Sequence, residues 1–324
     1  MKIIVPVAGV GTRLRPHTYS LPKPLLNVAG KPVLAHVLDP TLVLDPDEVI
    51  FVVGYKGEDI RAFVEDNYSF KAKFIEQDKL LGLGYALNLA LEEVDDEPVM
   101  IVLGDTIVES DLQAMVEAGD FVLGLRQVED PSRFGIAQVE NGVVVKLEEK
   151  PENPKSNLAL IGLYYFKRPS LLKQALDVIV KSGKTTKGEI QLTDALEMMI
   201  NDGITFHTYQ VQGWYDCGKK ETMLDSNHKL LAKLDPPEPV EGSILIPPVY
   251  IAPGAQIINC VLGPNVSVAD DSTITNCVIR NTIVGRETTI TNMIIENSLV
   301  GNQVSLVGES RVVNIGDASV FDIL

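Results

Sequence analysis

Beyond Pro248 the chain repeats itself with a period of sixteen to seventeen residues. The tripeptide Asn259-Cys260-Val261 recurs at 276–278 and, as Asn-Met-Ile, at 292–294. Two further columns are purely aliphatic: Ile257, Ile274, Ile290 and Leu306, and Ile251, Val268, Val284 and Val300. A unit this short cannot bury an apolar face by itself, so each coil must pack against its neighbours. The repeat therefore predicts a β-solenoid.

Aliphatic residues also recur in steps of six within a coil, as from Leu262 to Val268 to Ile274. These steps resemble the hexapeptide repeats of left-handed β-helices, and about four coils fit between 249 and 315. Cys260 and Cys277 hold equivalent positions in successive coils, so we expect them to stack inside the solenoid as small apolar residues. The predicted repeat domain, with its C-terminal tail, comprises residues 249–324.

The chain before the repeat alternates apolar runs typical of strands with segments typical of helices. We predict strands at 2–7, 48–53, 73–76 and 99–103, and helices at 33–38, 58–66 and 84–93. This alternation predicts a three-layer α/β fold around a mostly parallel sheet. Ligands of such sheets bind at the carboxyl ends of the strands, which is where residues 8–11 and the pair Gly104-Asp105 fall.

We predict that the middle of the chain, about 120 to 215, extends the same domain. It is richer in strands, predicted at 134–139, 143–148 and 158–166, with helices at 170–180 and 189–201. A last helix, 220–233, runs into Asp235-Pro236-Pro237-Glu238-Pro239, where clustered prolines end a helix. We therefore predict a first domain at 1–235 and a proline-rich linker at 236–248.

Composition restricts the classes of function. The formal net charge of -16 argues against general nucleic-acid binding, which needs a basic face. No apolar run is long enough to cross a membrane and no signal peptide is recognisable, so we expect a cytoplasmic protein without membrane contact. The three cysteines are too few and too dispersed for a disulfide framework or a zinc site.

The first 38 residues, in contrast, contain no acid and carry a local charge of +5. They include Gly9-Val10-Gly11-Thr12-Arg13 directly after the first predicted strand. Gly-x-Gly alone is weak evidence for a phosphate site. A dinucleotide fingerprint would need a third glycine at Leu14, and a P-loop would need Gly-Lys-Ser/Thr. These features indicate a small, local anion site.

The whole string from Gly9 to Pro16, followed by Pro22-Lys23-Pro24-Leu25-Leu26 and Gly30-Lys31-Pro32, resembles the signature of the sugar-1-phosphate nucleotidyltransferases. One departure is Val10, where many members have a second glycine. The long form of glucose-1-phosphate thymidylyltransferase is similar in overall architecture, whereas Pro6-Val7-Ala8-Gly9-Val10-Gly11-Thr12-Arg13 looks more like the glucose-1-phosphate uridylyltransferases. The implied fold is the Rossmann-like sheet of the nucleotide-diphospho-sugar transferases, followed by a β-helix.

Further segments follow in the order that the family requires. Residues 77–84 resemble the segment that selects the nucleobase, and Leu103-Gly104-Asp105 and Gly213-Trp214-Tyr215-Asp216-Cys217-Gly218 resemble the two metal-binding elements. Segments 133–136, 148–151, 161–164 and 187–190 look like the wall of a sugar-phosphate site. Taken singly, each residue also has a structural interpretation: Asp105 as a turn or capping residue, Lys150 as a surface lysine, Glu189 as a helix-opening acid.

The resemblance implies a role for each residue. The nucleotide would be bound by Ala8, Gly9, Gly11, Thr12, Arg13, Lys23, Gln77, Gly82 and Asp105. The sugar phosphate would be bound by Gly135, Glu149, Lys150, Gly162, Tyr164 and Glu189. Arg13, Lys23, Asp105 and Asp216 would be catalytic. Mg²⁺, which prefers carboxylate and phosphate oxygens, would be held by Asp105 and Asp216.

The implied reaction joins a nucleoside triphosphate and a sugar 1-phosphate into a nucleotide-sugar, with release of pyrophosphate. We favour dTTP with glucose 1-phosphate, and UTP is the alternative nucleotide. A non-catalytic regulatory subunit of the same fold is a remote alternative. Some family members use the β-helix as an acyltransferase, but no histidine follows His228 to act as a base. We therefore expect the β-helix to serve structure or homo-oligomerisation.

Overall fold

The computed structural model describes residues 1–309 and divides the chain into two compact units, Met1–Ser226 and a second that begins at Asn227. The division lies inside helix α7 (Lys220–Leu231), before the proline segment that the sequence favoured. Asn227 is fully buried, and Ser267 Oγ of the repeat donates to its Oδ1 at 3.0 Å. This bond links the end of α7 to the repeat within the second unit.

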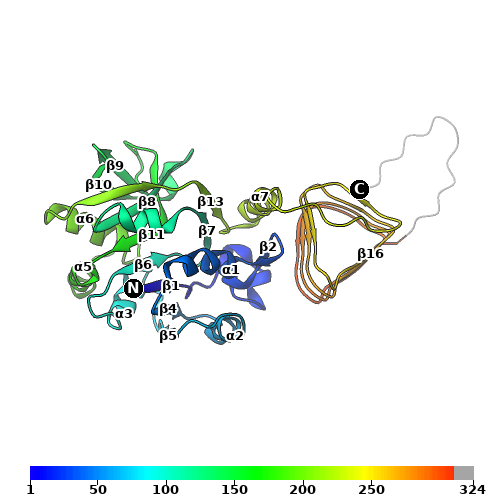
Figure 1. The fold of residues 1–324 in the computed structure, drawn as a ribbon, viewed down its shortest axis with the longest axis horizontal. Helices are drawn as coiled ribbons and strands as arrows, with labels where there is room; N and C mark the ends of the chain where they lie inside the picture. Colours follow the sequence, from blue (N-terminus) through cyan, green and yellow to red (C-terminus); the bar gives the residue numbers. More distant parts are fainter. Residues whose placement is uncertain (310–324) are drawn as a thin grey trace. The chain divides into compact units, whose positions relative to one another are not determined.

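The first unit is built on a nine-stranded sheet (Figure 1). Its spatial order is β5-β4-β1-β6-β11-β8-β12-β10-β9. The strands are β1 (Lys2–Pro6), β4 (Glu48–Val53), β5 (Ala72–Glu76), β6 (Val99–Val102), β8 (Phe121–Gln127), β9 (Gly135–Glu140), β10 (Val143–Glu149), β11 (Leu158–Phe166) and β12 (Phe206–Gln210). Strands β5, β4, β1 and β6 pair in parallel, as predicted, whereas β11 pairs antiparallel to both β6 and β8.

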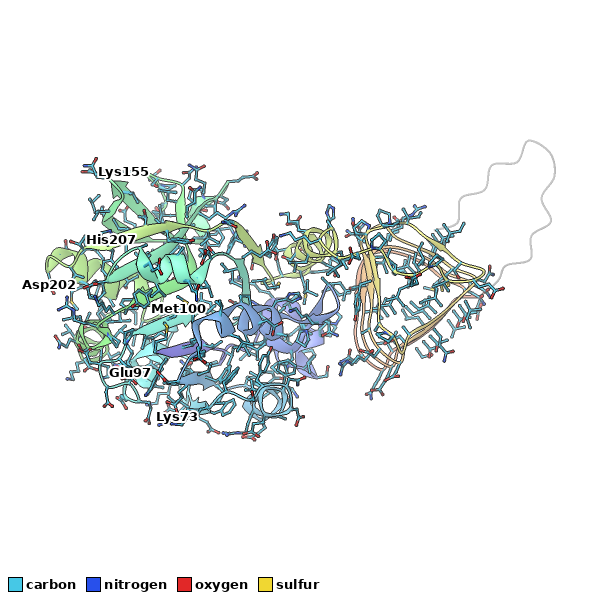
Figure 2. The ribbon with its side chains drawn as sticks, in the orientation of Figure 1. Lys73, Glu97, Met100, Lys155, Asp202 and His207 are labelled. Atoms are coloured by element: carbon cyan, nitrogen blue, oxygen red, sulfur yellow. The ribbon has the colours of Figure 1, made fainter. Side chains whose placement is uncertain are left out.

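Both faces of the parallel half are covered, which explains why its strands are continuous apolar runs. Ile4, Ile50 and Ile101 stand in register on one face and share a core with α3 (Leu83–Leu91). On β4 every residue is buried, and α2 (Gly57–Asn67) packs against Val53 at its start. In the side-chain view, Met100 of β6 lies in the interior and Lys155 projects from the surface (Figure 2).

The helices form the outer layers of this domain, so the three-layer α/β prediction is confirmed. The same core takes in α5 (Pro169–Ser182) and α6 (Leu192–Asn201). The domain has two further short helices, α1 (Val33–Leu38) and α4 (Leu112–Glu117). It also has five short 3₁₀ segments, at 12–14, 17–19, 23–25, 39–44 and 131–133. Within residues 1–309, no helix is long and apolar enough to cross a membrane.

Two small antiparallel pairs lie outside the main sheet. One joins β2 (Asn27–Val28) to β3 (Lys31–Pro32), just after the lysine-proline segment. The other joins β7 (Thr106–Glu109) to β13 (Gly213–Asp216) and pairs Asp216 with Thr106. The second pair therefore brings the end of the first unit back to the residues that follow β6.

The second unit is a parallel β-helix. Its strands are β14 (Ile244–Leu245), β15 (Val249–Ile251), β16 (Gln256–Ile258), β17 (Val261–Leu262), β18 (Val266–Val268), β19 (Thr273–Thr275), β20 (Val278–Val284), β21 (Thr289–Thr291), β22 (Ile294–Val300) and β23 (Ser305–Val307). The predicted columns are confirmed by the strand register: Ile257, Ile274, Ile290 and Leu306 align, as do Ile251, Val268, Val284 and Val300.

Two further details of the β-helix concern its ends and its cysteines. Ile244 already pairs with Val261, so the end of the predicted linker, 236–248, belongs to the first coil. The predicted stacking of the cysteines is confirmed, because the Cys277 amide lies 3.4 Å from Cys260 Sγ and both residues are buried. The part of the predicted domain from 310 to 324 lies outside the described residues.

Asparagine ladders run along the turns of the β-helix. Asn259 Nδ2 donates to Asn276 Oδ1 at 2.8 Å, and Asn276 Nδ2 donates to Asn292 Oδ1 at 3.1 Å. All three asparagines have φ between 51° and 56°. Asparagine tolerates this left-handed conformation better than other residues with a side chain. The asparagine that recurs in the repeat therefore turns the chain and links one coil to the next.

Candidate active site

The glycine loop, residues 8–12, leaves β1 at its carboxyl end. Gly11 has a φ of +67°, and a Cβ there would lie 2.9 Å from Lys23 Cβ. Buried Thr18 donates from its hydroxyl to Gly11 O at 3.0 Å, so the loop is held against the lysine segment. No atom lies within 4 Å of the Cβ position of Gly9. Glycine is therefore required at Gly11 by close packing, while the surroundings of Gly9 are open.

Two glycines from neighbouring strands let the loop pack against the sheet. A Cβ on Gly104, after β6, would lie 2.2 Å from Val7 Cγ1. A Cβ on Gly54, after β4, would lie 3.0 Å from Ala8 O. Our sequence reasoning did not single out Gly54. Its signal is a glycine directly after a buried strand, at the same edge of the sheet as the loop.

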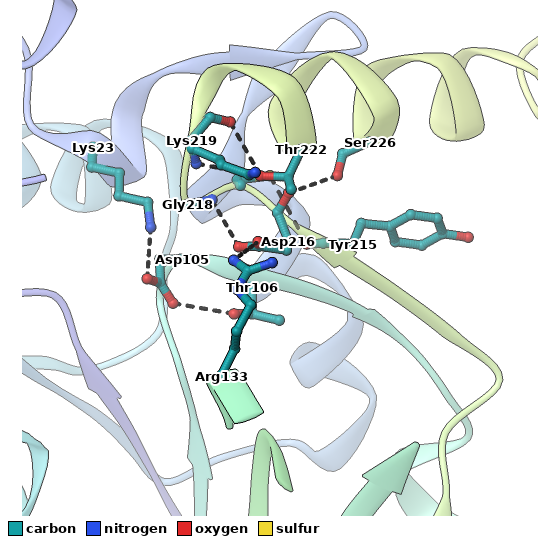
Figure 3. A network of polar contacts seen from close by, with 11 residues as sticks. Lys23, Asp105, Thr106, Arg133, Tyr215, Asp216, Gly218, Lys219, Thr222 and Ser226 are labelled. Carbon is teal, nitrogen blue, oxygen red and sulfur yellow. Dashed lines mark hydrogen bonds and ion pairs between the residues drawn. The ribbon is translucent and has the colours of Figure 1, made fainter. Parts of the chain in front are cut away.

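Asp105 follows Gly104 and meets Lys23 (Figure 3). Lys23 Nζ donates to Asp105 Oδ2 at 2.7 Å, and the Thr106 hydroxyl donates to Asp105 Oδ1 at 3.1 Å. Partial desolvation works to raise the pKa of Asp105, but the Lys23 charge and these two hydrogen bonds outweigh it, so the pKa lies below its ordinary value. The carboxylate is ionised, and 47% of its side chain is still exposed to a ligand.

Asp216 is held beside this pair by the β7–β13 ladder. It stands opposite Thr106, and its Oδ1 accepts a hydrogen bond from the Gly218 amide at 2.8 Å. Its Oδ2 lies 4.0 Å from Arg133 Nη2, and Figure 3 shows the arginine reaching it from the 131–133 turn. The two predicted metal ligands are thus adjacent, each next to a cation from a distant segment.

Arg13 has a different environment from Lys23. Its side chain is exposed, and no ion pair of Arg13 is found within residues 1–309. Thr12 beside it is exposed as well. The arginine charge near the glycine loop is therefore free to meet an anion.

The predicted nucleobase segment lies against the segment that contains Glu189. Gly82 has a φ of +110°, and a Cβ there would lie 2.7 Å from Ile190 O and 2.8 Å from Glu189 Cβ. Backbone hydrogen bonds join the two segments, from Ile190 N to Leu81 O and from Gly84 N to Ile190 O. Gln77 is buried and donates from its side chain to Lys79 O at 2.9 Å. That bond orients the Gln77 amide.

Three of the remaining predicted wall residues, Lys150, Gly135 and Tyr164, lie near Glu149. Lys150 Nζ lies 3.3 Å from Glu149 Oε1, and Gly135 pairs with Glu149 across β9 and β10. Burial and the Glu149 charge raise the pKa of Tyr164 well above its ordinary value, so its phenol stays protonated. Gly162 has a φ of +86°, and its carbonyl accepts the Leu103 amide at 2.9 Å, which connects β11 to the strand before Asp105.

The donor set of Asp105 and Asp216 suits Mg²⁺. This ion is usually held by one or two carboxylates, with water and substrate phosphate completing its coordination. Within residues 1–309, no group of three or more His, Cys, Asp and Glu side chains could hold a metal ion by itself. The two carboxylates match the number of protein ligands that Mg²⁺ usually has.

Comparison with known families shows which family the chain belongs to. Residues 2–233 match the family described as nucleotidyl transferase. The chain belongs to the nucleotidyl transferase family. Residues 238–321 match a second family, described as the GlmU-like C-terminal hexapeptide. The two matches cover the α/β unit and the β-helix in turn.

The relatives of this nucleotidyl transferase support the same assignment. The low-salt glycan biosynthesis nucleotidyltransferase Agl11 of Haloferax volcanii is 37% identical over 241 residues, which cover 71% of this chain and 66% of Agl11. A glucose-1-phosphate thymidylyltransferase of Streptomyces antibioticus is 33% identical over 282 residues, 82% of this chain and 77% of the relative. The match thus spans just under two thirds of Agl11.

A solved structure shares the fold. The crystal structure of a UDP-glucose pyrophosphorylase complexed with UDP-glucose superimposes with a TM-score of 0.63, covering 72% of this chain and 99% of that one. At 22% sequence identity this likeness concerns the fold alone.

Proposed function

We propose that this nucleotidyl transferase joins a nucleoside triphosphate to a sugar 1-phosphate and releases pyrophosphate. One observation carries the proposal: Lys23, Asp105 and Asp216, from three separate segments, meet beside a glycine loop at the carboxyl end of β1. That is where open α/β sheets bind ligands. A family match alone would not require these charges to be together.

In the proposed reaction, a phosphate oxygen of the sugar 1-phosphate attacks the α-phosphorus of the nucleotide. The bond from that phosphorus to the bridging oxygen breaks, and its electron pair leaves with pyrophosphate. The nucleophile is already ionised, so no general base is needed. Catalysis then depends on positioning the two anions and on stabilising the charge at phosphorus.

Each part of the site has a role in this scheme. The amides of residues 9–12 and the charges of Arg13 and Lys23 bind the triphosphate and the leaving pyrophosphate. We propose that Asp105 and Asp216 bind Mg²⁺, which would neutralise phosphate charge when bound. Gln77 and Gly82 would contact the base. Glu149 and Lys150, with Gly135, Gly162, Tyr164 and Glu189, would line the sugar-phosphate site.

For the substrates we propose dTTP and glucose 1-phosphate, with UTP as the alternative nucleotide. The similarity to a thymidylyltransferase over 82% of this chain supports dTTP. The amino-acid sequence of the glycine loop, which resembles that of the uridylyltransferases, supports UTP. Thymine and uracil differ by one methyl group, which is worth about 1 to 3 kcal/mol of discrimination in an apolar pocket. Only a direct comparison of the two nucleotides separates them.

The test is a pyrophosphate-release screen of purified protein with Mg²⁺, each pyrimidine triphosphate and a panel of sugar 1-phosphates. We expect the highest kcat/KM with dTTP and glucose 1-phosphate. An advantage above about tenfold for UTP would replace the thymidylyltransferase assignment with a uridylyltransferase. Release of no pyrophosphate from any pair would favour the non-catalytic subunit.

We further propose that the β-helix mediates homo-oligomerisation. Ile244, Val261, Val278 and Ile294 stand in register in four successive coils and form an apolar stripe. Ile244 is 61% exposed and Ile294 is 75% exposed. An exposed apolar stripe is typical of an interaction surface.

Sedimentation tests the oligomer. Ile294→Glu should shift the protein to a smaller species. Val178→Glu replaces a 56% exposed valine on α5 and should not change the sedimentation profile. An unchanged profile for Ile294→Glu would contradict a role for the stripe.

A further inference from the structure

Thr193, a residue that the sequence reasoning did not assign to the site, contacts one of the predicted sugar-binding residues. It lies in the first turn of α6 and is 7% exposed. Its hydroxyl donates to Glu149 Oε2 at 2.7 Å. The Glu149 side chain is 8% exposed, and the polar atoms of a side chain this deeply buried need hydrogen-bond partners.

The two oxygens of Glu149 have separate partners. Oε2 accepts the bond from Thr193, whereas Oε1 lies 3.3 Å from Lys150 Nζ. Lys150, the partner of Oε1, is 42% exposed, whereas Thr193, the partner of Oε2, is 7% exposed. The threonine thus engages the carboxylate oxygen whose partner is buried.

A second contact fixes the strand that carries Glu149. Glu197, one helical turn after Thr193, accepts the Leu147 amide of β10 through its Oε2 at 2.6 Å. Residues four apart lie on the same face of a helix. One face of α6 therefore holds the end of β10 at two points, the backbone at Leu147 and the side chain at Glu149.

Gly135 makes room for this arrangement. It stands opposite Glu149 on β9, and a Cβ there would lie 2.9 Å from Thr193 Oγ1 and 3.1 Å from Glu149 Oε2. Any side chain at this position would press on both partners of the hydrogen bond. The predicted wall glycine is thus explained by the packing around the Thr193–Glu149 pair.

We propose that Thr193 is a positioning residue for sugar recognition. By holding Oε2 of Glu149, it fixes the rotamer of the carboxylate and directs Oε1 to accept a hydrogen bond from a hydroxyl of the sugar 1-phosphate. The inference rests on the proposed function, since it needs a sugar phosphate in the site. It assigns a specificity role to a threonine that does not itself touch the substrate.

The test replaces the hydroxyl without changing the shape of the side chain. Thr193→Val should raise KM for the sugar 1-phosphate about tenfold, as expected for a charge-assisted hydrogen bond, and change KM for the nucleotide less than about twofold. Thr193→Ser keeps the hydroxyl and should restore the sugar KM to within about twofold of wild type. Thr193→Ala serves as a second variant if valine impairs folding.

Deoxy analogues of the preferred sugar 1-phosphate provide a readout that a structural role would not change. Wild type should discriminate against the analogue that lacks the hydroxyl bound by Glu149. Thr193→Val should lose most of that discrimination while other deoxy analogues keep theirs. Loss of discrimination against every analogue equally would contradict a specific role for Glu149 and Thr193.

Thr41→Val is the matched control. Thr41 is 1% exposed and donates to Leu38 O at 2.7 Å in a 3₁₀ segment that contributes no predicted site residue. It should lower stability without changing the sugar KM. If Thr193→Val does the same in an active enzyme, the positioning role is wrong while the proposed function stands. If wild type turns over no sugar phosphate, the proposed function fails and the inference fails with it.

Discussion

Lys23 Nζ lies 2.7 Å from Asp105 Oδ2, although 82 residues separate the two in the chain. The lysine thus stands at the carboxylate that we propose as a ligand for Mg²⁺. A lysine ammonium and a metal ion compete for the same negative charge, so we expect Lys23 to weaken metal binding at Asp105 in the free protein. A bound triphosphate would then supply a new anion for the lysine.

The first prediction follows from this competition. Lys23→Met should tighten metal binding by the free protein about tenfold, because a nearby positive charge is removed. The same change should weaken nucleotide binding. Mn²⁺ titration followed by electron paramagnetic resonance measures the first effect, and calorimetry with dTTP measures the second.

Lys167→Met is the control, since Lys167 Nζ also lies 2.7 Å from an aspartate, Asp120, on an exposed surface. It should change neither affinity. Equal Mn²⁺ affinity of wild type and Lys23→Met would show that the lysine does not compete with the metal.

Asp216→Asn should lower kcat by about 10² or more with Mg²⁺ while the fold persists. The amide can still accept the hydrogen bond from Gly218, but it lacks the charge that a hard cation requires. Steady-state kinetics with circular dichroism as the folding control would measure this. Wild-type turnover would remove Asp216 from the proposed metal site.

Gly104→Ala and Gly9→Ala should separate packing from ligand binding. An added Cβ at Gly104 would lie 2.2 Å from Val7 Cγ1, so we expect a loss of about 1 to 3 kcal/mol of unfolding free energy. Gly9 has open space around it, so Gly9→Ala should unfold like wild type yet bind nucleotide more weakly. Chemical denaturation and nucleotide titration of both variants check this, and a destabilised Gly9→Ala would contradict it.

Asn276 combines two contributions in the β-helix, and two substitutions separate them. Asn276→Ala loses both ladder hydrogen bonds and places a side chain at a φ of 54°, which costs about 1 to 2 kcal/mol for the conformation alone. Asn276→Gly loses only the ladder. Thermal unfolding should therefore rank wild type above glycine and glycine above alanine. A glycine variant less stable than alanine would show that the conformation is unimportant.

The cysteines should be unreactive in the native protein. Burial raises the pKa of Cys217 to about 12, and Cys260 and Cys277 are buried as well. At pH 8 the Cys217 thiol holds about 10³-fold less thiolate than an ordinary cysteine. Ellman's reagent should detect almost no thiol until the protein is unfolded, when three react. One fast thiol in the native state would contradict the packing described for these residues.

The sequence was sufficient for features that depend on neighbouring residues. Strand and helix periodicity is local, so the strands β1, β4 and β11 and the helices α1, α2 and α3 were predicted close to their observed bounds, whereas α4 was not predicted. The β-helix columns were predicted for a related reason: identical coils stack only in register, so a repeat such as Asn259, Asn276 and Asn292 translates directly into a ladder.

Only the tertiary structure decided which residues meet. The antiparallel insertion of β11 between β6 and β8 has no local signature, because its apolar run would suit a parallel strand equally well. Lys23 reaches Asp105, Arg133 reaches Asp216 and Thr193 reaches Glu149 through contacts between segments far apart in the chain. The sequence determined the secondary-structure elements and the chemical groups that they carry. The packing of distant segments against one another decided which charged side chains pair with each other and which remain free for substrates.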